Sequence, residues 1–290
     1  MISRVRQFPR PSQILINLAL AIVVLVCLFP VYWSFISSLK GRDEIYESNP
    51  SLWVKRPTLG NYRWLFTQRQ TSMIPLNLLN SLKVAVGSIV IQLFVVTLAG
   101  YAFARLDFRG RDAIFYFLIL VMFIPRAGGL MATYELMDAL NLRNSHLGLM
   151  LLFPSPVSVA LFIMRQSFLG IPRELEESAM IDGASIWQVF LRIALPMVKS
   201  ALVVVAIFEF VYVWGDYLIT FTLIDHPELY TISVAVKQVT GWFTLFISSA
   251  WSTYGCDNAA YMLAITPVVL VYVFMQRWFV RGLREGILKL

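Results

Sequence analysis

Four long runs without a charged residue constrain the fold of this chain more than any other feature. The runs are Ile14–Leu39, Val84–Ala104, Leu147–Met164 and Asn258–Gln276. A helix of about 18 or more apolar residues is long enough to cross the hydrocarbon core of a bilayer. Composition points the same way, because only 14% of the residues are charged, against roughly 25% in soluble domains. The sequence therefore predicts an integral membrane protein.

Two further runs are as long but carry charges. Ala113–Tyr134 contains Arg126, and Ser200–Ile224 contains Glu209 and Asp216. We interpret both as spans, so the predicted fold is all-α with six transmembrane helices. The chain has no low-complexity region, long linker or clear internal repeat, and residues 1–290 are expected to form a single domain.

Charge asymmetry predicts the orientation of the spans. With six spans, the segments on one side hold fourteen Lys and Arg against seven Asp and Glu, while charges on the other side cancel. Short basic loops stay in the cytoplasm, so both termini are predicted to be cytoplasmic. Gln238–Cys256 is a seventh uncharged window; it is expected to be external or re-entrant, because another span would separate the basic termini. This bias explains the net charge of +7 without a nucleic-acid partner.

The cysteines and histidines give no sign of a metal site or a disulfide. Cys27 and Cys256 are far apart and lie in or near apolar spans, so both are expected to be ordinary thiols. His146 and His226 lack ligand spacing and are expected to be solvated in outside loops. An aromatic segment, Asn61–Phe66, is expected to form a short helix at the level of the lipid headgroups.

The one long amphiphilic stretch is Glu174–Pro196, in the predicted cytoplasmic segment between the fourth and fifth spans. Pro172 suits the start of a helix, and acidic residues in the first turns favour the positive end of the helix dipole. Four residues then recur at i, i+3, i+4 and i+7, which places them on one shallow face. These are Leu175, Ser178, Ala179 and Asp182.

Gly183 is predicted to end this helix, because glycine adopts the backbone conformation of a tight turn. Ser185 and Gln188 have the spacing of a capping box that starts a second helix, and Pro196 is expected to end it. Residue types alone allow two interpretations: a docking element for a partner, or a helix pair lying on lipid.

The order of residues favours the docking element over the helix pair on lipid. Glu177-Ser-Ala-Met-Ile-Asp-Gly183-Ala, followed by Ile193 and Leu195-Pro196, closely resembles the EAA loop of ATP-binding-cassette importer permeases. Further stretches are similar to the carbohydrate-uptake branch of that family, as in the maltose-system G subunit. They are PSLW at 50–53, PTLGNY at 57–62, AGYAFARLDFRGRD at 99–112, MRQSF at 164–168 and QRWFVRGL at 276–283.

This resemblance implies a type I importer permease of the bacterial or archaeal cytoplasmic membrane, carrying a sugar or oligosaccharide. Implied partners are a second, homologous permease, two ATPase subunits, an extracytoplasmic solute-binding protein and the lipid bilayer. The resemblance implies that the loop, residues 172–196, couples this chain to an ATPase. The residues expected to do so are Glu174, Glu177, Ser178, Ala179, Asp182, Gly183, Ala184, Ile193, Leu195 and Pro196.

The chain is not expected to be an enzyme or to bind a cofactor. It lacks a glycine-rich loop ending in Gly-Lys-Ser or Gly-Lys-Thr, so ATP and Mg²⁺ would be bound by the partner ATPases. Two departures from the family pattern stand out. Ser178 replaces the usual alanine, a small residue for a small residue, and the tail Arg284–Leu290 differs from the usual threonine-bearing end.

Ionisable side chains within spans are costly and often functional, and aromatic rings beside hydrogen-bonding groups suit a sugar. The candidate substrate path in the fifth span is Glu209, Tyr212, Trp214, Asp216 and Tyr217. Alternatively, Glu209 pairs within the bundle or faces the second permease, and Asp216 lies near the outer surface, as does Arg126 of the third span.

Other functions remain open from the sequence. An importer for another polar solute, such as a polyol phosphate or an amino acid, fits the same permease pattern. A secondary transporter would typically show an inverted repeat, and a membrane-embedded enzyme would need a converging catalytic set. The sequence shows neither feature.

Overall fold

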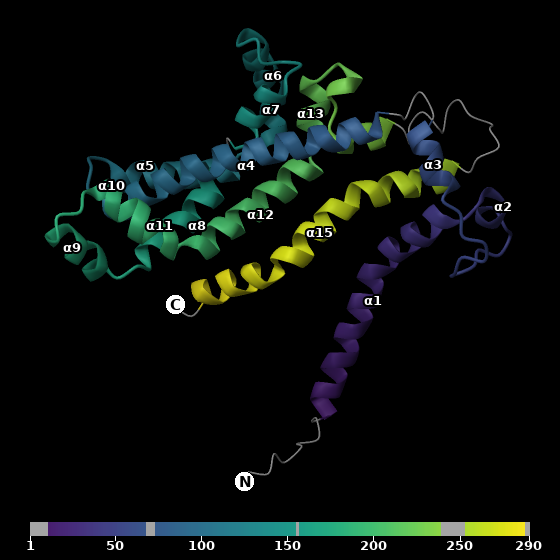
Figure 1. The fold of residues 1–290 in the computed structure, drawn as a ribbon, viewed down its shortest axis with the longest axis horizontal. Coiled ribbons are helices and arrows are strands. Elements are labelled where there is room, and N and C mark those ends of the chain that lie inside the picture. Colours follow the sequence, from purple (N-terminus) through teal and green to yellow (C-terminus); the bar gives the residue numbers. More distant parts are fainter. Residues whose placement is uncertain (1–10, 68–72, 155–156, 239–252, 288–290) are drawn as a thin grey trace. The chain divides into compact units, whose positions relative to one another are not determined.

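The computed structural model describes residues 11–67, 73–154, 157–238 and 253–287, and the regular structure within these ranges is helical. Figure 1 shows long helices joined by short helical turns and loops. The chain packs as two compact units, one of Met1–Thr71 with Val239–Leu263 and one of Ser72–Gln238 with Ala264–Leu290. The expectation of a single domain stays a prediction.

The first unit contains α1 (Pro11–Leu39), α2 (Arg42–Ile45), α3 (Gly60–Thr67) and the beginning of α15 (Thr253–Ile287). The side chain of Asn61 joins α3 to the end of α1, donating hydrogen bonds to the carbonyl oxygens of Ser38 (2.8 Å) and Lys40 (2.9 Å). The predicted helix at residues 61–66 is therefore confirmed. Trp64 and Leu65 are buried in the protein, and the position of this helix at the level of the headgroups stays a prediction.

The second unit is built around α4 (Ile74–Arg105), its longest described helix. Short elements follow α4 along the chain. They are α5 (Arg111–Leu120), η1 (Val121–Phe123), η2 (Arg126–Gly129), α6 (Leu130–Ala139), α7 (His146–Leu152), α8 (Ser158–Leu169), α9 (Arg173–Ile181), α10 (Ile186–Val189), the π-helix η3 (Phe190–Ala194), α11 (Leu195–Met197), α12 (Lys199–Gly215), α13 (Leu218–Leu223) and η4 (Pro227–Leu229). Residues 232–238 are also helical.

Helices α8 and α12 pack along α4, and this three-helix contact holds a hydrophobic core. Its buried residues include Val96 and Ala104 of α4, Met164 of α8 and Val205 of α12. Gly100 permits the close approach of α4 to α8, because a Cβ atom there would lie 2.7 Å from the Cβ of Met164. A larger residue at position 100 would force the two helices apart.

Among the described residues, three helical segments are long and apolar enough to cross a membrane: Gln13–Leu39, Ile74–Arg105 and Tyr254–Arg277. A fourth arises if Ile186–Met197 and Lys199–Gly215, which meet at a bend of 73°, count as one span. The first, second and sixth predicted spans are thus continuous helices. Pro30 and Pro267 lie inside α1 and α15 without ending them.

The other three predicted spans are not continuous helices. In 147–164, α7 ends at Leu152 and α8 begins at Ser158, at the sequence Pro154-Ser-Pro156, because proline lacks the N–H that continues a helix. In 113–134, the helix breaks around Pro125 into two 3₁₀ turns. In 200–224, it stops at Gly215 and resumes at Leu218. The number of membrane crossings stays a prediction.

Candidate functional site

The first half of the predicted loop is α9, which begins directly after Pro172. Glu174 and Glu176 lie in its first turn, where their charges favour the positive end of the helix dipole. The hydroxyl of Ser178 donates to the carbonyl oxygen of Leu175 within the helix (3.1 Å). The predicted helix is thus confirmed, with its first residue one position after the proline.

The turn at Gly183 is also confirmed. Gly183 has φ = +89°, the left-handed region that glycine adopts without a steric penalty. Its N–H donates to the Met180 carbonyl (3.1 Å), and the N–H of Ala184 donates to the Ala179 carbonyl (2.9 Å). This pair of bonds is the Schellman motif that closes helix C-termini. No atom would lie within 4 Å of a Cβ at position 183, so backbone conformation, rather than space, requires glycine here.

The second half begins with the predicted capping box. The Ser185 hydroxyl accepts a hydrogen bond from the Gln188 N–H (3.4 Å), and the Gln188 side chain accepts one from the Ser185 N–H (2.7 Å). Together the two bonds satisfy backbone donors that the first turn of α10 leaves open. Sequence and structure agree on where this helix starts.

The end of this second helix differs from the prediction. Pro196 does not stop it; the chain passes through the π-helix η3 and then α11, and the break comes at Val198 before α12. A proline lacks the N–H for the bond to the carbonyl four residues earlier, and a local π-turn is one way to redistribute those bonds. The bend of 73° between the two helical segments follows at once.

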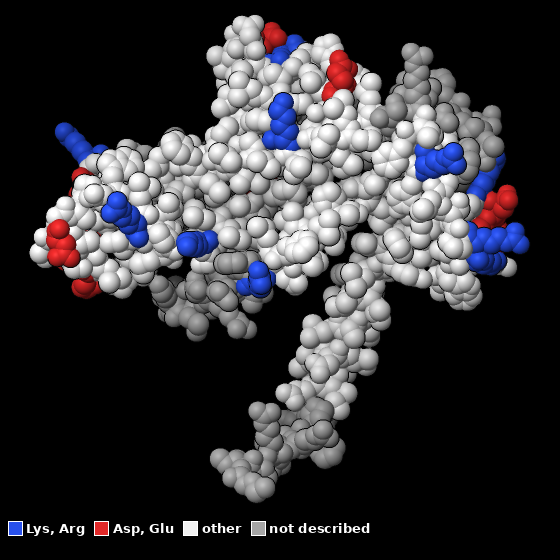
Figure 2. Space-filling view, viewed as in Figure 1, with Lys and Arg blue, Asp and Glu red and all other residues white. Residues whose placement is uncertain are grey.

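The surface of the loop combines exposed apolar side chains with carboxylates. Ile181 is 86% exposed and Trp187 is 64% exposed, and Figure 2 shows acidic and basic residues gathered at the end of the second unit where α9 lies. Exposed apolar groups rimmed by charges are typical of protein docking surfaces. Of the residues predicted for coupling, the exposed ones are Glu174, Glu177, Ser178, Asp182, Gly183 and Pro196, and the half-buried ones are Ala179, Ala184, Ile193 and Leu195.

The sequence interpretation missed a buried ion pair beside this surface. The Arg105 Nε of α4 donates to the Glu176 Oε1 of α9 at 2.9 Å, and both side chains are only 7% exposed. Arg105 Nη2 also donates to the Ile171 carbonyl (2.6 Å). The sequence offers no local signal for this pair, because Arg105 and Glu176 lie 71 positions apart.

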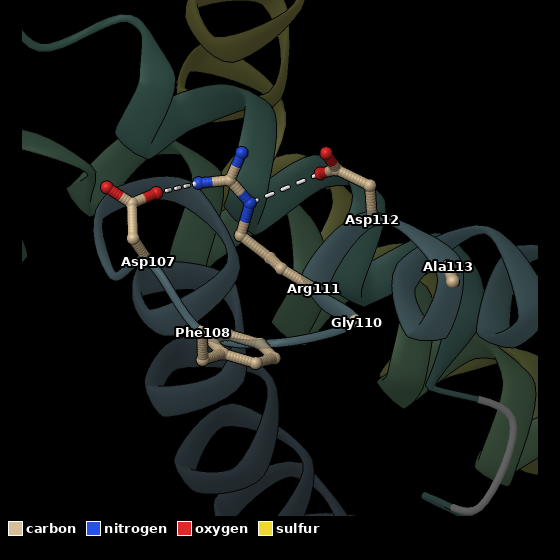
Figure 3. A pocket seen from close by; sticks show the side chains of 6 residues that line it. All are labelled: Asp107, Phe108, Gly110, Arg111, Asp112 and Ala113. Carbon is tan, nitrogen blue, oxygen red and sulfur yellow. Dashed lines mark hydrogen bonds and ion pairs between the residues drawn. The ribbon is translucent and has the colours of Figure 1, made fainter.

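A second charged cluster occupies the connection between α4 and α5. Asp107, Phe108, Gly110, Arg111, Asp112 and Ala113 line a hollow of about 310 Å³. Figure 3 shows the Arg111 guanidinium between two carboxylates, with Nε 3.2 Å from Asp112 and Nη1 2.7 Å from Asp107. The hydrogen bond and charge of Asp112, followed by those of Asp107, raise the pKa of Arg111. These contacts fix the turn that leads into α5.

The candidate substrate residues lie in the second half of α12 and just after it, and two of them make clear structural contacts. The Trp214 indole N–H donates to the Ala264 carbonyl (2.9 Å), and the ring is 5% exposed. The Asp216 carboxylate, one residue before the N-cap Tyr217, accepts from the N–H of Thr220 (3.0 Å) and so satisfies an open backbone donor in the first turn of α13. The structure therefore gives Trp214 and Asp216 roles in packing and capping.

The other three candidates differ in exposure. Glu209 is buried, at 5% exposed. Tyr212 and Tyr217 are half-buried, and their rings pack against Phe153 (5.9 Å) and Phe221 (5.2 Å). Their role in a substrate path stays a prediction.

The expectation of two solvated histidines is correct for one. His226 is exposed, with its Nδ1 3.8 Å from a Glu228 carboxylate oxygen. His146 is buried, and its Nε2 lies 2.9 Å from the Leu229 carbonyl oxygen. The prediction was wrong for His146, because the loop after α13 folds over the start of α7.

Comparison with known families decides the identity of the chain. The model of the family "Binding-protein-dependent transport system inner membrane component" matches residues 10–285. The chain belongs to this family. It is a multi-pass permease of the inner, or cytoplasmic, membrane and a transport subunit of an ATP-binding-cassette importer.

Individual relatives match the permease over nearly its full length. It is 30% identical over 270 residues to the galactooligosaccharides transport system permease protein GanQ of Bacillus subtilis (strain 168), covering 93% of each chain. It is 30% identical over 280 residues to the sn-glycerol-3-phosphate transport system permease protein UgpE of Pectobacterium atrosepticum, covering 96% of this chain and 98% of that protein.

Solved structures support the fold of the permease. A chain in the crystal structure of a bacterial ABC transporter that imports the acidic polysaccharide alginate matches with a TM-score of 0.83 and 20% identity, covering 94% of this chain and 99% of that chain. A second structure shows a bacterial alginate transporter in complex with an alginate pentasaccharide-bound periplasmic protein; its chain matches with a TM-score of 0.63 and 16% identity, covering 91% and 94%. Both matches extend across the two compact units.

Proposed function

We propose that this permease forms half of a heterodimeric channel that imports a sugar or oligosaccharide. The observation that carries the coupling part of the proposal is the pair α9 and α10 around Gly183, which presents Ile181 and Trp187 at its surface. A groove on an ATPase subunit would cover these side chains. Glu177, exposed on α9, would meet a basic group of that subunit.

The remaining parts of the proposal follow from the family and the charge pattern. Six crossings place both termini and the coupling loop, residues 172–196, in the cytoplasm of a bacterium or archaeon. A second permease completes the channel, two ATPase subunits bind ATP and Mg²⁺, and an extracytoplasmic solute-binding protein delivers the solute. Closure of the ATPase dimer then moves the loop and switches the channel between inward-facing and outward-facing states.

A carbohydrate is the favoured solute class. GanQ is named for galactooligosaccharides, and the permease is also 29% identical over 277 residues to the arabinooligosaccharides transport system permease protein AraQ of Bacillus subtilis. Glu209, Tyr212 and Tyr217 offer a carboxylate and aromatic rings, and such groups suit a neutral sugar. The role of these residues is part of the proposal.

Glycerol 3-phosphate is a second candidate solute, because UgpE is named for it and shares 30% identity with this permease. A phosphate needs cationic or N–H donors along its path. The candidate substrate path instead carries the carboxyl group of Glu209, which when ionised would repel a phosphate. This electrostatic mismatch favours the sugar.

Copurification of the complete complex tests the proposal. The permease would be expressed with its partner subunits, reconstituted with the solute-binding protein, and assayed for ATP hydrolysis with galactobiose, an arabinotriose or glycerol 3-phosphate. Stimulation by one of the sugars is expected. Stimulation by glycerol 3-phosphate alone would reassign the solute, and failure of an ATPase subunit to copurify would refute the coupling role.

A further inference from the structure

The two halves of the coupling loop are attached to the membrane helices by different chemistry. In the second half, Phe190 is buried and its ring packs 5.0 Å from that of Tyr101 and 6.3 Å from that of Phe168. In the first half, Glu176 is the one side chain of α9 that the described part of the chain buries. An apolar contact therefore anchors η3, and a carboxylate anchors α9.

The guanidinium of Arg105 binds both the Glu176 carboxylate of α9 and the backbone that precedes this helix in the chain. Arg105 is the last residue of α4; its Nε donates to Glu176 at 2.9 Å and its Nη2 donates to the Ile171 carbonyl at 2.6 Å. One turn earlier on α4, the Tyr101 hydroxyl donates to the other Glu176 oxygen (3.4 Å). The end of α4 thus contacts α9 at its first turn and at the residue before Pro172.

The buried ion pair fixes the position of α9 on α4 more than it adds to the stability of the fold. A buried ion pair often contributes no more net stability than packed apolar residues of the same volume. However, the planar guanidinium binds at fixed angles, whereas an apolar contact is non-directional. Because both side chains are 7% exposed, water and salt screen the pair little.

The neighbouring glutamate faces the other way. Glu177 is exposed while Glu176 is buried, so the two consecutive carboxylates lie on different sides of α9, as the helical rotation of about 100° per residue allows. One side meets solvent, where a partner can dock. The other side meets α4.

We propose that Arg105 and Glu176 are a positioning pair that makes α4 move together with α9 when an ATPase displaces the coupling loop. This inference rests on the proposed coupling function and goes beyond it, since it assigns the transmission of movement to residues outside the docking surface. Glu177 contributes to docking of the ATPase, and Glu176 transmits the movement of α9 to α4. α4 is the helix on which α7, α8 and α12 pack, so its displacement carries the core of the second unit.

Two double variants separate transmission from stability. Arg105→Ala with Glu176→Ala removes the contact without leaving an unpaired buried charge. Arg105→Met with Glu176→Leu replaces it by an apolar contact of similar volume. Arg109→Ala is the matched control, because Arg109 is an exposed arginine four residues after Arg105. All variants would be studied in the complete complex in proteoliposomes.

Electron–electron double resonance would measure the distance between α4 and α9 with and without ATP and vanadate. Spin labels at Phe94→Cys and Arg173→Cys, both exposed positions, would be introduced after Cys27 and Cys256 are replaced by serine. We expect one narrow distance in the wild type, unchanged by nucleotide. In the double-alanine variant the distance should broaden and shift on adding nucleotide. The Met/Leu variant should keep the stability of the wild type but also show a broadened distance, because an apolar contact is non-directional, while the control should resemble the wild type.

Uptake of a labelled galactooligosaccharide per ATP hydrolysed gives the functional measurement. The double-alanine variant should keep its bound ATPase but lose about fivefold or more of this ratio, the range of an ordinary coupling free energy. Normal ATPase binding with an unchanged distance and an unchanged ratio would overturn the positioning role alone. If the wild-type permease binds no ATPase, both the positioning role and the proposed function fail. The distance measurement needs no transported solute, so it tests the positioning role even if the solute is not a sugar.

Discussion

The ring of Phe190 lies against the ring of Tyr101, with their centroids 5.0 Å apart. Tyr101 belongs to α4 and Phe190 begins the π-helix that continues the coupling loop. The hydroxyl of the same tyrosine reaches Glu176 of α9. Tyr101 therefore contacts both halves of the loop, one through its ring and one through its oxygen.

Replacing Phe190 by alanine should destabilise the permease. The side chain is 5% exposed and packs on two aromatic rings, so its loss leaves a cavity that costs about 3 to 5 kcal/mol. Thermal unfolding in detergent would measure the effect. Leu191→Ala is the control, because Leu191 is 55% exposed and its truncation should change the unfolding midpoint little. Equal midpoints for both variants would contradict the packing role.

Gly183 should tolerate asparagine but not valine. Its φ of +89° lies in the left-handed region, which asparagine visits and which β-branched residues avoid. No neighbouring atom restricts a side chain there, so the effect is one of backbone strain rather than collision. ATPase copurification and stimulated hydrolysis should fall for Gly183→Val and stay near normal for Gly183→Asn.

Gly128 provides the control for this prediction. A Cβ at position 128 would also lie in open space, but Gly128 has no left-handed φ, so Gly128→Val should lack the backbone penalty. Comparable loss of ATPase binding in the two valine variants would show that side-chain bulk, rather than turn geometry, matters. Equal binding by wild type and Gly183→Val would refute the requirement for glycine.

Reversing the charge of Glu177 tests the docking surface. Glu177→Lys keeps the helix, because the residue is exposed and has no buried contact to lose, but it places a cation where a basic partner group is proposed. Copurified ATPase should decrease while the permease remains inserted in the membrane. Arg173→Glu, a reversal on an exposed residue at the start of the same helix, controls for net charge. Undiminished ATPase binding and transport in Glu177→Lys would mean that the loop is structural.

Much of the local structure of the loop could be predicted from the sequence, since its signals are local. Glycine at the turn and the Ser185–Gln188 pair act within a few residues of themselves, and both appear as expected. The ion pair of Arg105 with Glu176 joins residues 71 positions apart. No local pattern specifies such a partner, so Glu176 could be grouped only with the other acids of its turn.

The sequence also does not tell which prolines interrupt a predicted span. The chain breaks near Pro125 and Pro154 but runs through Pro30 and Pro267. Each proline removes one hydrogen bond, and whether the helix continues depends on packing and on how neighbouring groups satisfy the freed carbonyl. Apolar length therefore predicted three continuous helices that are long enough to cross a membrane, whereas the continuity of the other three predicted spans depended on tertiary contacts that the sequence does not display.

Asp216 is expected to act as a cap, which separates it from a substrate ligand. Its carboxylate accepts hydrogen bonds from the N–H (3.0 Å) and the hydroxyl (3.3 Å) of Thr220. Asp216→Ala should lower the free energy of unfolding by about 1 kcal/mol, a usual value for a lost cap, whereas Asp216→Asn retains an accepting oxygen and should stay close to the wild type. Thermal unfolding would be measured alongside the sugar preference of stimulated ATP hydrolysis. A changed preference with unchanged stability in Asp216→Ala would return this residue to the substrate path.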